Sequence, residues 1–130
     1  FDLAQSHGSL EKAFAPVEAD ALIVGFVVSD NVPKKFLIRA VGPGLAAFGL
    51  TGTMANPKFT VFQGSTKIAE NDSWNAQLQP LARSVGAFDL TLGSRDAALL
   101  LTLAPGNYTA QISGVGATTG EAIVEVYDVP

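Results

Sequence analysis

The chain has 130 residues, of which 48% are hydrophobic and 15% charged, with a net charge of −4 and no cysteine. This length and composition fit one domain that folds without disulfide bonds and exclude intrinsic disorder. The eight basic residues are scattered, and every apolar run is shorter than a bilayer span, so neither nucleic acid binding nor membrane insertion is expected.

The first 14 residues are the hardest to interpret. Phe1, Leu3 and Gln5 alternate as an edge strand would, and the alternative is a mobile N-terminal arm. The only histidine, His7, lies here without a G-x-S-x-G motif or an acid pair elsewhere, so we expect no enzyme activity. The chain begins with Phe rather than Met, so either a leader was removed or the domain was cut from a longer polypeptide.

Two strands are predicted next. Leu22–Val28 is apolar throughout, which is typical of a central strand covered on both faces. Lys35–Val41 follows and ends at a Gly-Pro-Gly sequence, after which Leu45–Phe48 has room for at most one helical turn. Arg39 lies within the second of these apolar runs, so its charge must reach water or an acid.

We therefore predict a structural ion pair for Arg39. Asp96, Glu125 and Asp128 are the candidate partners, and the sequence does not choose among them. Recognition of a carboxylate or a sugar by Arg39 is the alternative.

The middle of the chain contains a predicted hairpin and a short helix. Lys58–Phe62 and Lys67–Glu70 flank a Gln-Gly-Ser-Thr sequence that is typical of a hairpin turn. In Asn75–Val85 the apolar residues fall on one helical face. Pro80 would break this helix unless it is the first residue of a shorter one.

The last third of the chain contains three more predicted strands. Ala97–Leu103 and Tyr108–Ser113 flank a Pro-Gly pair that suits a type II turn. In the second of these strands Tyr108, Ala110 and Ile112 should face inward. In Ala122–Tyr127 one alternating set should be buried and the other exposed.

Together these elements predict an all-β fold. Roughly seven or eight short strands, with one or two short helical turns and no strand–helix–strand rhythm, indicate an antiparallel β-sandwich. No internal repeat or linker interrupts the chain, so residues 1–130 form a single predicted domain.

Two stretches resemble a bacterial protein family. Phe62–Asp72 has the sequence FQGSTKIAEND, and Leu103–Val126 has the sequence LAPGNYTAQISGVGATTGEAIVEV. Both are similar to the pre-peptidase C-terminal (PPC) domain, a β-sandwich module of large secreted bacterial proteins. The resemblance implies a jelly-roll-like sandwich with an attachment or accessory role, secreted or at the cell surface.

A loop after the predicted hairpin gathers oxygen donors. Glu70, Asn71 and Asp72 are consecutive, and Asp96 is a possible further ligand, a set that suits Ca²⁺. The resemblance also makes Ca²⁺ worth considering, because some PPC-like domains hold it, and no other cofactor is expected. The alternative is that Asn71 and Asp72 cap a turn and the following helix.

Aromatic residues give the candidate ligand site. Trp74 follows the same loop, and its ring could stack on a sugar with help from Tyr127 or Tyr108. The alternative is that Trp74 is a plug that closes the end of the sandwich.

Two functions remain open. The first is a non-catalytic extracellular module that binds a polysaccharide or a cell-surface glycan. The second is a structural or assembly domain that packs against neighbouring domains or copies of itself, with strand addition by the N-terminal segment as one route.

Overall fold

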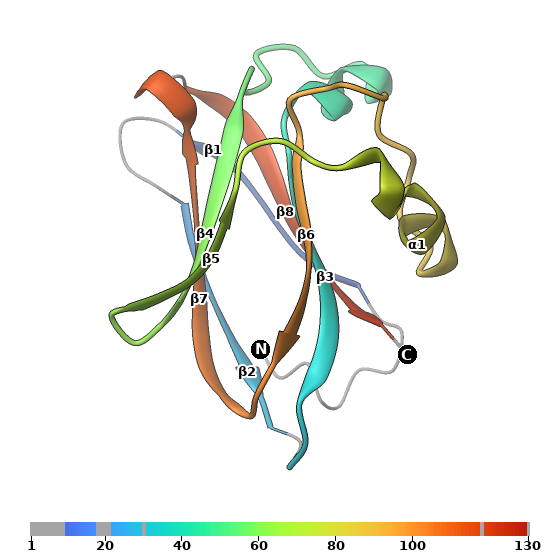
Figure 1. Ribbon diagram of the computed structural model, residues 1–130. Helices are drawn as coiled ribbons and strands as arrows, with labels where there is room; N and C mark the ends of the chain where they lie inside the picture. Colours follow the sequence, from blue (N-terminus) through green and yellow to red (C-terminus); the bar gives the residue numbers. More distant parts are fainter. Residues whose placement is uncertain (1–9, 18–21, 30, 118, 130) are drawn as a thin grey trace.

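The computed structural model describes residues 10–17, 22–29, 31–117 and 119–129. Within this part, two four-stranded sheets pack face to face, with strand orders β1-β8-β3-β6 and β2-β7-β4-β5 (Figure 1). The strands are β1 (Leu10–Val17), β2 (Leu22–Val28), β3 (Lys34–Val41), β4 (Pro57–Gln63), β5 (Thr66–Asn71), β6 (Ala97–Leu103), β7 (Gly106–Gly114) and β8 (Gly120–Val129). Each pair of neighbouring strands is antiparallel.

This strand order is that of a jelly roll. The first four strands alternate between the two sheets. Each of the last four then pairs with one of the first four: β5 with β4, β6 with β3, β7 with β2 and β8 with β1. The predicted all-β, jelly-roll-like sandwich is therefore confirmed, with eight strands in the described residues. Also within these residues, no helix is long and apolar enough to cross a bilayer.

The core between the sheets follows the two-residue period of the strands. Tyr108, Ala110 and Ile112 of β7 are buried, while the residues between them are partly exposed, as predicted. They pack against buried side chains from both sheets, among them Phe26, Phe36, Ile38, Phe59, Val61, Val124 and Val126. Phe26 and Tyr108 stack with ring centroids 5.6 Å apart.

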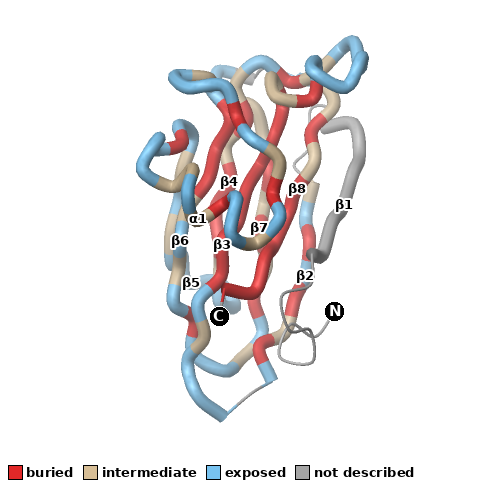
Figure 2. Tube along the Cα trace, turned by 90° about the vertical axis from the view of Figure 1, so that its right-hand side faces the viewer, coloured by how far each residue is buried: buried red, intermediate tan, exposed pale blue. Residues whose placement is uncertain are grey.

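The central strands β3 and β8 are buried on both faces over most of their length, and they are largely red in Figure 2. Their outer face is covered by η2 (Pro43–Phe48) and by the segment containing η3 (Ala76–Leu78) and α1 (Gln79–Ser84). The prediction that β8 exposes one face was wrong, because Glu125 and Tyr127 lie beneath this cover.

The interpretation of Leu22–Val28 was also wrong. Among the described residues, β2 pairs only with β7 and lies at the edge of its sheet, and Ile23 is 59% exposed. An apolar run on an edge strand looks the same in sequence as one on a central strand, because the run carries no information about neighbours. The strands covered on both faces are β3 and β8 instead.

Local turn chemistry determines the hairpin and the helix as predicted. β4 and β5 join through Gly64, whose φ of 61° favours glycine. Helix α1 begins at Gln79 with Pro80 in its first turn, where a missing N–H costs nothing. The structure describes only part of the N-terminal segment for which an edge strand or a mobile arm is predicted. β1 is an edge strand, whereas Phe1, Leu3, Gln5 and His7 lie outside the described residues.

Gly42 provides a first testable consequence of the packing at the end of β3. A Cβ at this position would overlap the carbonyl oxygen of Met54. We expect Gly42→Ala to lower the free energy of unfolding by about 2–3 kcal/mol, since backbone atoms must shift to make room. Urea unfolding measures this loss. Gly49→Ala is the contrasting substitution: its Cβ meets no atom within 4 Å, and its cost of about 1 kcal/mol comes from a φ of 81° alone.

Candidate functional site

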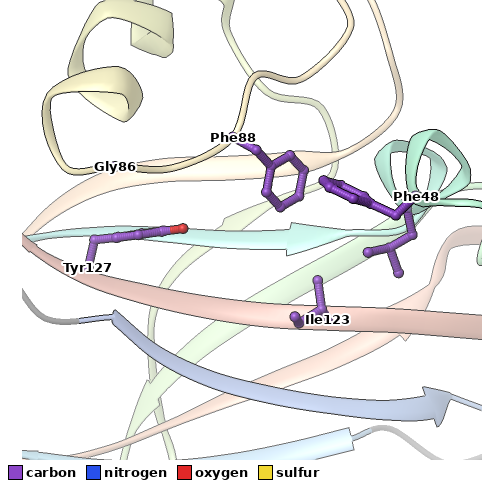
Figure 3. Close-up of a pocket in the computed structure, with 6 residues that line it drawn as sticks. Phe48, Gly86, Phe88, Ile123 and Tyr127 are labelled. Atoms are coloured by element: carbon purple, nitrogen blue, oxygen red, sulfur yellow. The ribbon is translucent and has the colours of Figure 1, made fainter.

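A pocket of about 360 Å³ lies on the outer face of the β1-β8-β3-β6 sheet (Figure 3). Three parts of the chain line it: η2, the segment after α1, and β8. The lining residues are Leu45, Phe48, Gly86, Phe88, Ile123 and Tyr127. A recess with these side chains suits an apolar group.

The local sequence explains how each lining residue reaches the pocket. Ile123 and Tyr127 are four residues apart on β8, so both point to the same side of the sheet. Pro43 begins η2, and Gly49, with a φ of 81°, ends it directly after Phe48. Gly86 has the same positive φ after α1 and turns the chain back toward Phe88.

Two phenylalanines form one wall. The rings of Phe48 and Phe88 meet edge to face, with centroids 4.9 Å apart and planes at 77°. Figure 3 shows both rings above the strand that carries Ile123. Phe48 is 61% exposed even so, which is high for a phenylalanine, and leaves its ring available to a partner.

A buried ion pair lies in the layer below the pocket. Glu125 sits between Ile123 and Tyr127 on the same face of β8 and is directly opposite Arg39 of β3. Arg39 Nε lies 2.9 Å from Glu125 Oε1, and the two side chains are 1% and 0% exposed. The N–H is not aligned on that oxygen, so the contact is mainly Coulombic.

Arg39 also anchors the covering segment. Its Nη1 donates to the carbonyl oxygen of Phe88 at 2.8 Å, and its guanidinium carbon lies 4.5 Å from the centre of the Phe88 ring. Of the three candidate partners of Arg39, the structure thus places Glu125 against it. Of the other two candidates, Asp128 lies 3.8 Å from Lys34 and Asp96 is engaged at the end of β3.

Electrostatics near the pocket leave it without a reactive group. Burial, reinforced by the charge of Glu125, raises the pKa of the Tyr127 hydroxyl well above its ordinary value. In the segment that carries Gly86 and Phe88, Arg83 donates to both carboxylate oxygens of Asp89 at 2.9 and 2.8 Å. Those hydrogen bonds lower the pKa of Asp89, and the two opposite charges neutralise each other.

The predicted metal ligands interact with different groups of the protein. Glu70 accepts a hydrogen bond from Thr60 and pairs with Lys67 at 3.1 Å, a hydrogen bond that lowers the pKa of Glu70. Asn71 Oδ1 accepts from the backbone N–H groups of Ser73 and Ala98, which is the turn-capping alternative.

Asp96 lies beside this loop, since its carbonyl oxygen accepts from the Trp74 N–H at 2.9 Å, but its carboxylate is buried and bound to groups at the end of β3. Its carboxylate accepts from Gly42 N at 2.9 Å, Gly44 N at 3.1 Å and Ser94 Oγ at 2.6 Å. Asp72 is exposed. No three acids or histidines of the described residues form a cluster that could hold a metal, so the calcium prediction has no such cluster to rest on.

The predicted aromatic platform is not assembled. Trp74 is 9% exposed and packs with Val41 and Leu90, and its indole N–H donates to Ser94 Oγ at 3.1 Å. This is the plug alternative. Tyr108 lies in the core between the sheets, and only Tyr127 reaches the pocket. The low exposure of Trp74 and Tyr108 leaves little ring surface on which a sugar could stack.

Apart from Tyr127, sequence reasoning missed the residues that form the pocket. Leu45, Phe48 and Phe88 lie in segments without strand periodicity, where single apolar residues carry no signal of a shared destination. One signal was available: Phe48 and Phe88 each lie within two residues of a glycine, Gly49 and Gly86, and a glycine there allows a sharp turn.

Fold and pocket together define a jelly-roll β-sandwich module with an aromatic recess on one outer face. The structure is similar to the crystal structure of the pre-peptidase C-terminal domain of collagenase from Bacillus anthracis. The TM-score is 0.52 with 9% sequence identity, and the match covers 89% of this chain and 85% of that chain. No family model matches the sequence, and neither does any curated protein. The likeness confirms a PPC-like β-sandwich fold.

Proposed function

We propose that this chain is a non-catalytic module of a secreted or cell-surface protein, and that its aromatic pocket holds an apolar side chain of a neighbouring polypeptide. The observation that carries the proposal is the pocket lined by Phe48, Phe88, Ile123 and Tyr127, with the Phe48 ring still largely exposed. The extracellular setting rests on the sequence resemblance to PPC domains and on the shared fold.

The chemistry around the pocket supports a binding role rather than catalysis. The Tyr127 hydroxyl is the one titratable group among the lining side chains, and burial and Glu125 keep it protonated at neutral pH. A general base or nucleophile needs a group that changes protonation near the working pH. Arg39 and Glu125 are nearby, but each is committed to the other and covered.

The lining favours a polypeptide over a glycan. Sugar sites need several polar groups that bond to the hydroxyls of the ring, because a buried hydroxyl without a partner costs binding energy. Leucine, phenylalanine, isoleucine and a glycine provide most of this lining. The exposed ion pair of Arg83 and Asp89, in the segment that carries Phe88, neutralises its own charges, so it neither attracts nor repels a charged partner strongly.

A titration followed by amide chemical shifts tests the proposal. N-acetyl-L-phenylalaninamide and N-acetyl-L-leucinamide serve as probes of a polypeptide side chain, and cellohexaose and chitohexaose as probes of a glycan. We expect the two amides, and not the sugars, to shift the signals of Phe48, Phe88 and Ile123. Phe48→Ser should weaken this binding about tenfold, since about 1.4 kcal/mol of ring contact is lost.

Leu92→Ser is the matched control, because Leu92 is an apolar residue with 68% exposure that does not line the pocket. It should bind the amides as the unsubstituted protein does. Shifts at the pocket caused by the oligosaccharides alone would replace the polypeptide with a glycan. Absence of shifts from all four probes would overturn the pocket as a binding site.

A further inference from the structure

Strand β6 is an edge strand that lacks the usual protection. Among the described residues it pairs only with β3. Its sequence, AALLLTL, contains no charge and no proline, and Leu100 is 41% exposed. Natural sheets generally protect such an edge with lysine, proline, a bulge or a covering segment, because its free N–H and C=O groups attract another strand.

The neighbouring edge of the other sheet shows what protection looks like. β5 lies beside β6 on the near side of the sandwich (Figure 1). It carries Lys67 and Glu70, and the ladder to β4 shifts register between Val61 and Phe62. Charges and an irregular ladder both discourage strand addition. β6 has neither.

The orientation of the backbone identifies the groups that β6 offers. The Ala98 N–H donates to the side chain of Asn71, so it faces away from β3. Because backbone groups alternate along an antiparallel strand, those of Leu100 and Thr102 also face away from β3. The segment after β5 crosses only the start of β6 in Figure 1. In the described structure, no other hydrogen bond occupies the outward groups of residues 99–103.

We propose that two copies of this chain pair through their β6 strands, antiparallel and about a two-fold axis at Leu101. In this register Leu100 of each copy lies opposite Thr102 of the second copy, and each such pair exchanges both of its N–H···O=C bonds. The Asn71–Ala98 hydrogen bond stays intact. The two β1-β8-β3-β6 sheets then form one continuous sheet.

A second copy is the occupant that this edge fits best. An uncharged strand can pair with itself without placing like charges opposite each other, which would otherwise oppose a symmetric contact. Leu101 meets its own counterpart at the axis, and the leucines on either side extend the apolar contact. Since one strand pair buries little surface, the association should be weak and concentration-dependent. The proposal does not depend on the pocket.

Sedimentation velocity over a concentration series provides the test. We expect the average mass to rise from 13.5 kDa toward about twice that value as concentration increases. Leu100→Lys places a charge in each half of the interface and should weaken association at least tenfold. Thr102→Pro removes an N–H that faces away from β3, so it should do the same while preserving the β3 ladder. Ile23→Lys, on the β2 edge, should leave association unchanged.

Circular dichroism shows whether each variant is folded. If Leu100→Lys does not fold, the association of Thr102→Pro tests the proposal instead. The unsubstituted protein provides a further measurement: exchange of the Leu100 and Thr102 amide hydrogens should slow as concentration rises. A constant mass of 13.5 kDa at every concentration would overturn the proposal. The proposal would also be wrong if the two β6 variants associated as strongly as the unsubstituted protein. The same holds if Ile23→Lys lost as much association as the β6 variants.

Discussion

Replacement of Glu125 by alanine is expected to lower the free energy of unfolding by about 3–5 kcal/mol, the largest effect of any single change considered for this chain. The substitution leaves the Arg39 guanidinium buried without its 2.9 Å counter-charge. It also removes a negative charge close to the Tyr127 hydroxyl. Urea unfolding, followed by circular dichroism, measures the change.

A second variant separates charge from packing. Arg39→Met combined with Glu125→Leu removes both charges and keeps most of the volume, so it should recover most of the loss seen with Glu125→Ala. The exposed pair of Arg83 and Asp89 is the matched control, with side chains 64% and 51% exposed. Asp89→Ala should cost less than about 1 kcal/mol. Equal losses in the buried and exposed pairs would contradict this account of the ion pair.

Asp96→Ala is expected to lower the free energy of unfolding by about 3–4 kcal/mol. The carboxylate accepts hydrogen bonds from the backbone N–H groups of Gly42 and Gly44 and from the Ser94 hydroxyl, and the side chain is fully buried. Alanine leaves these donors in place without an acceptor. Thermal and urea unfolding should report the same loss.

Two comparisons make this prediction specific. Asp96→Asn keeps an oxygen that can accept from Gly42 and Gly44, so it should cost about half as much as Asp96→Ala. Asp72→Ala, at an exposed aspartate of the neighbouring loop, should change stability by less than about 0.5 kcal/mol. A similar effect of Asp72→Ala and Asp96→Ala would show that the buried hydrogen bonds are not what stabilises this junction.

The features that the sequence predicted correctly are those that depend on neighbouring residues. Gly64 permits the backbone conformation of the hairpin turn, and Pro80 can only begin a helix, so both elements follow from a few residues. Alternation along β7 likewise determines which side chains enter the core. The PPC resemblance added the jelly-roll order, which such local patterns do not contain.

The errors concern contacts between distant segments. The sequence shows that Arg39 needs an acid, but only the register of β3 against β8 selects Glu125. Leu22–Val28 and β3 are similarly apolar, and their positions in the sheets, edge and centre, depend on the whole topology. The pocket could not be predicted for the same reason, because it forms where η2 and the segment after α1 cross β8.

The pocket is lined mainly by residues from the connections between strands rather than from the strands themselves. Leu45 and Phe48 belong to the connection between β3 and β4, and Gly86 and Phe88 to the connection between β5 and β6. Insertions, deletions and side-chain changes in connections leave the hydrogen-bonded ladders intact and are tolerated far better than changes in strands. The shape and lining of this pocket can therefore change, in evolution or by engineering, while the sandwich stays the same.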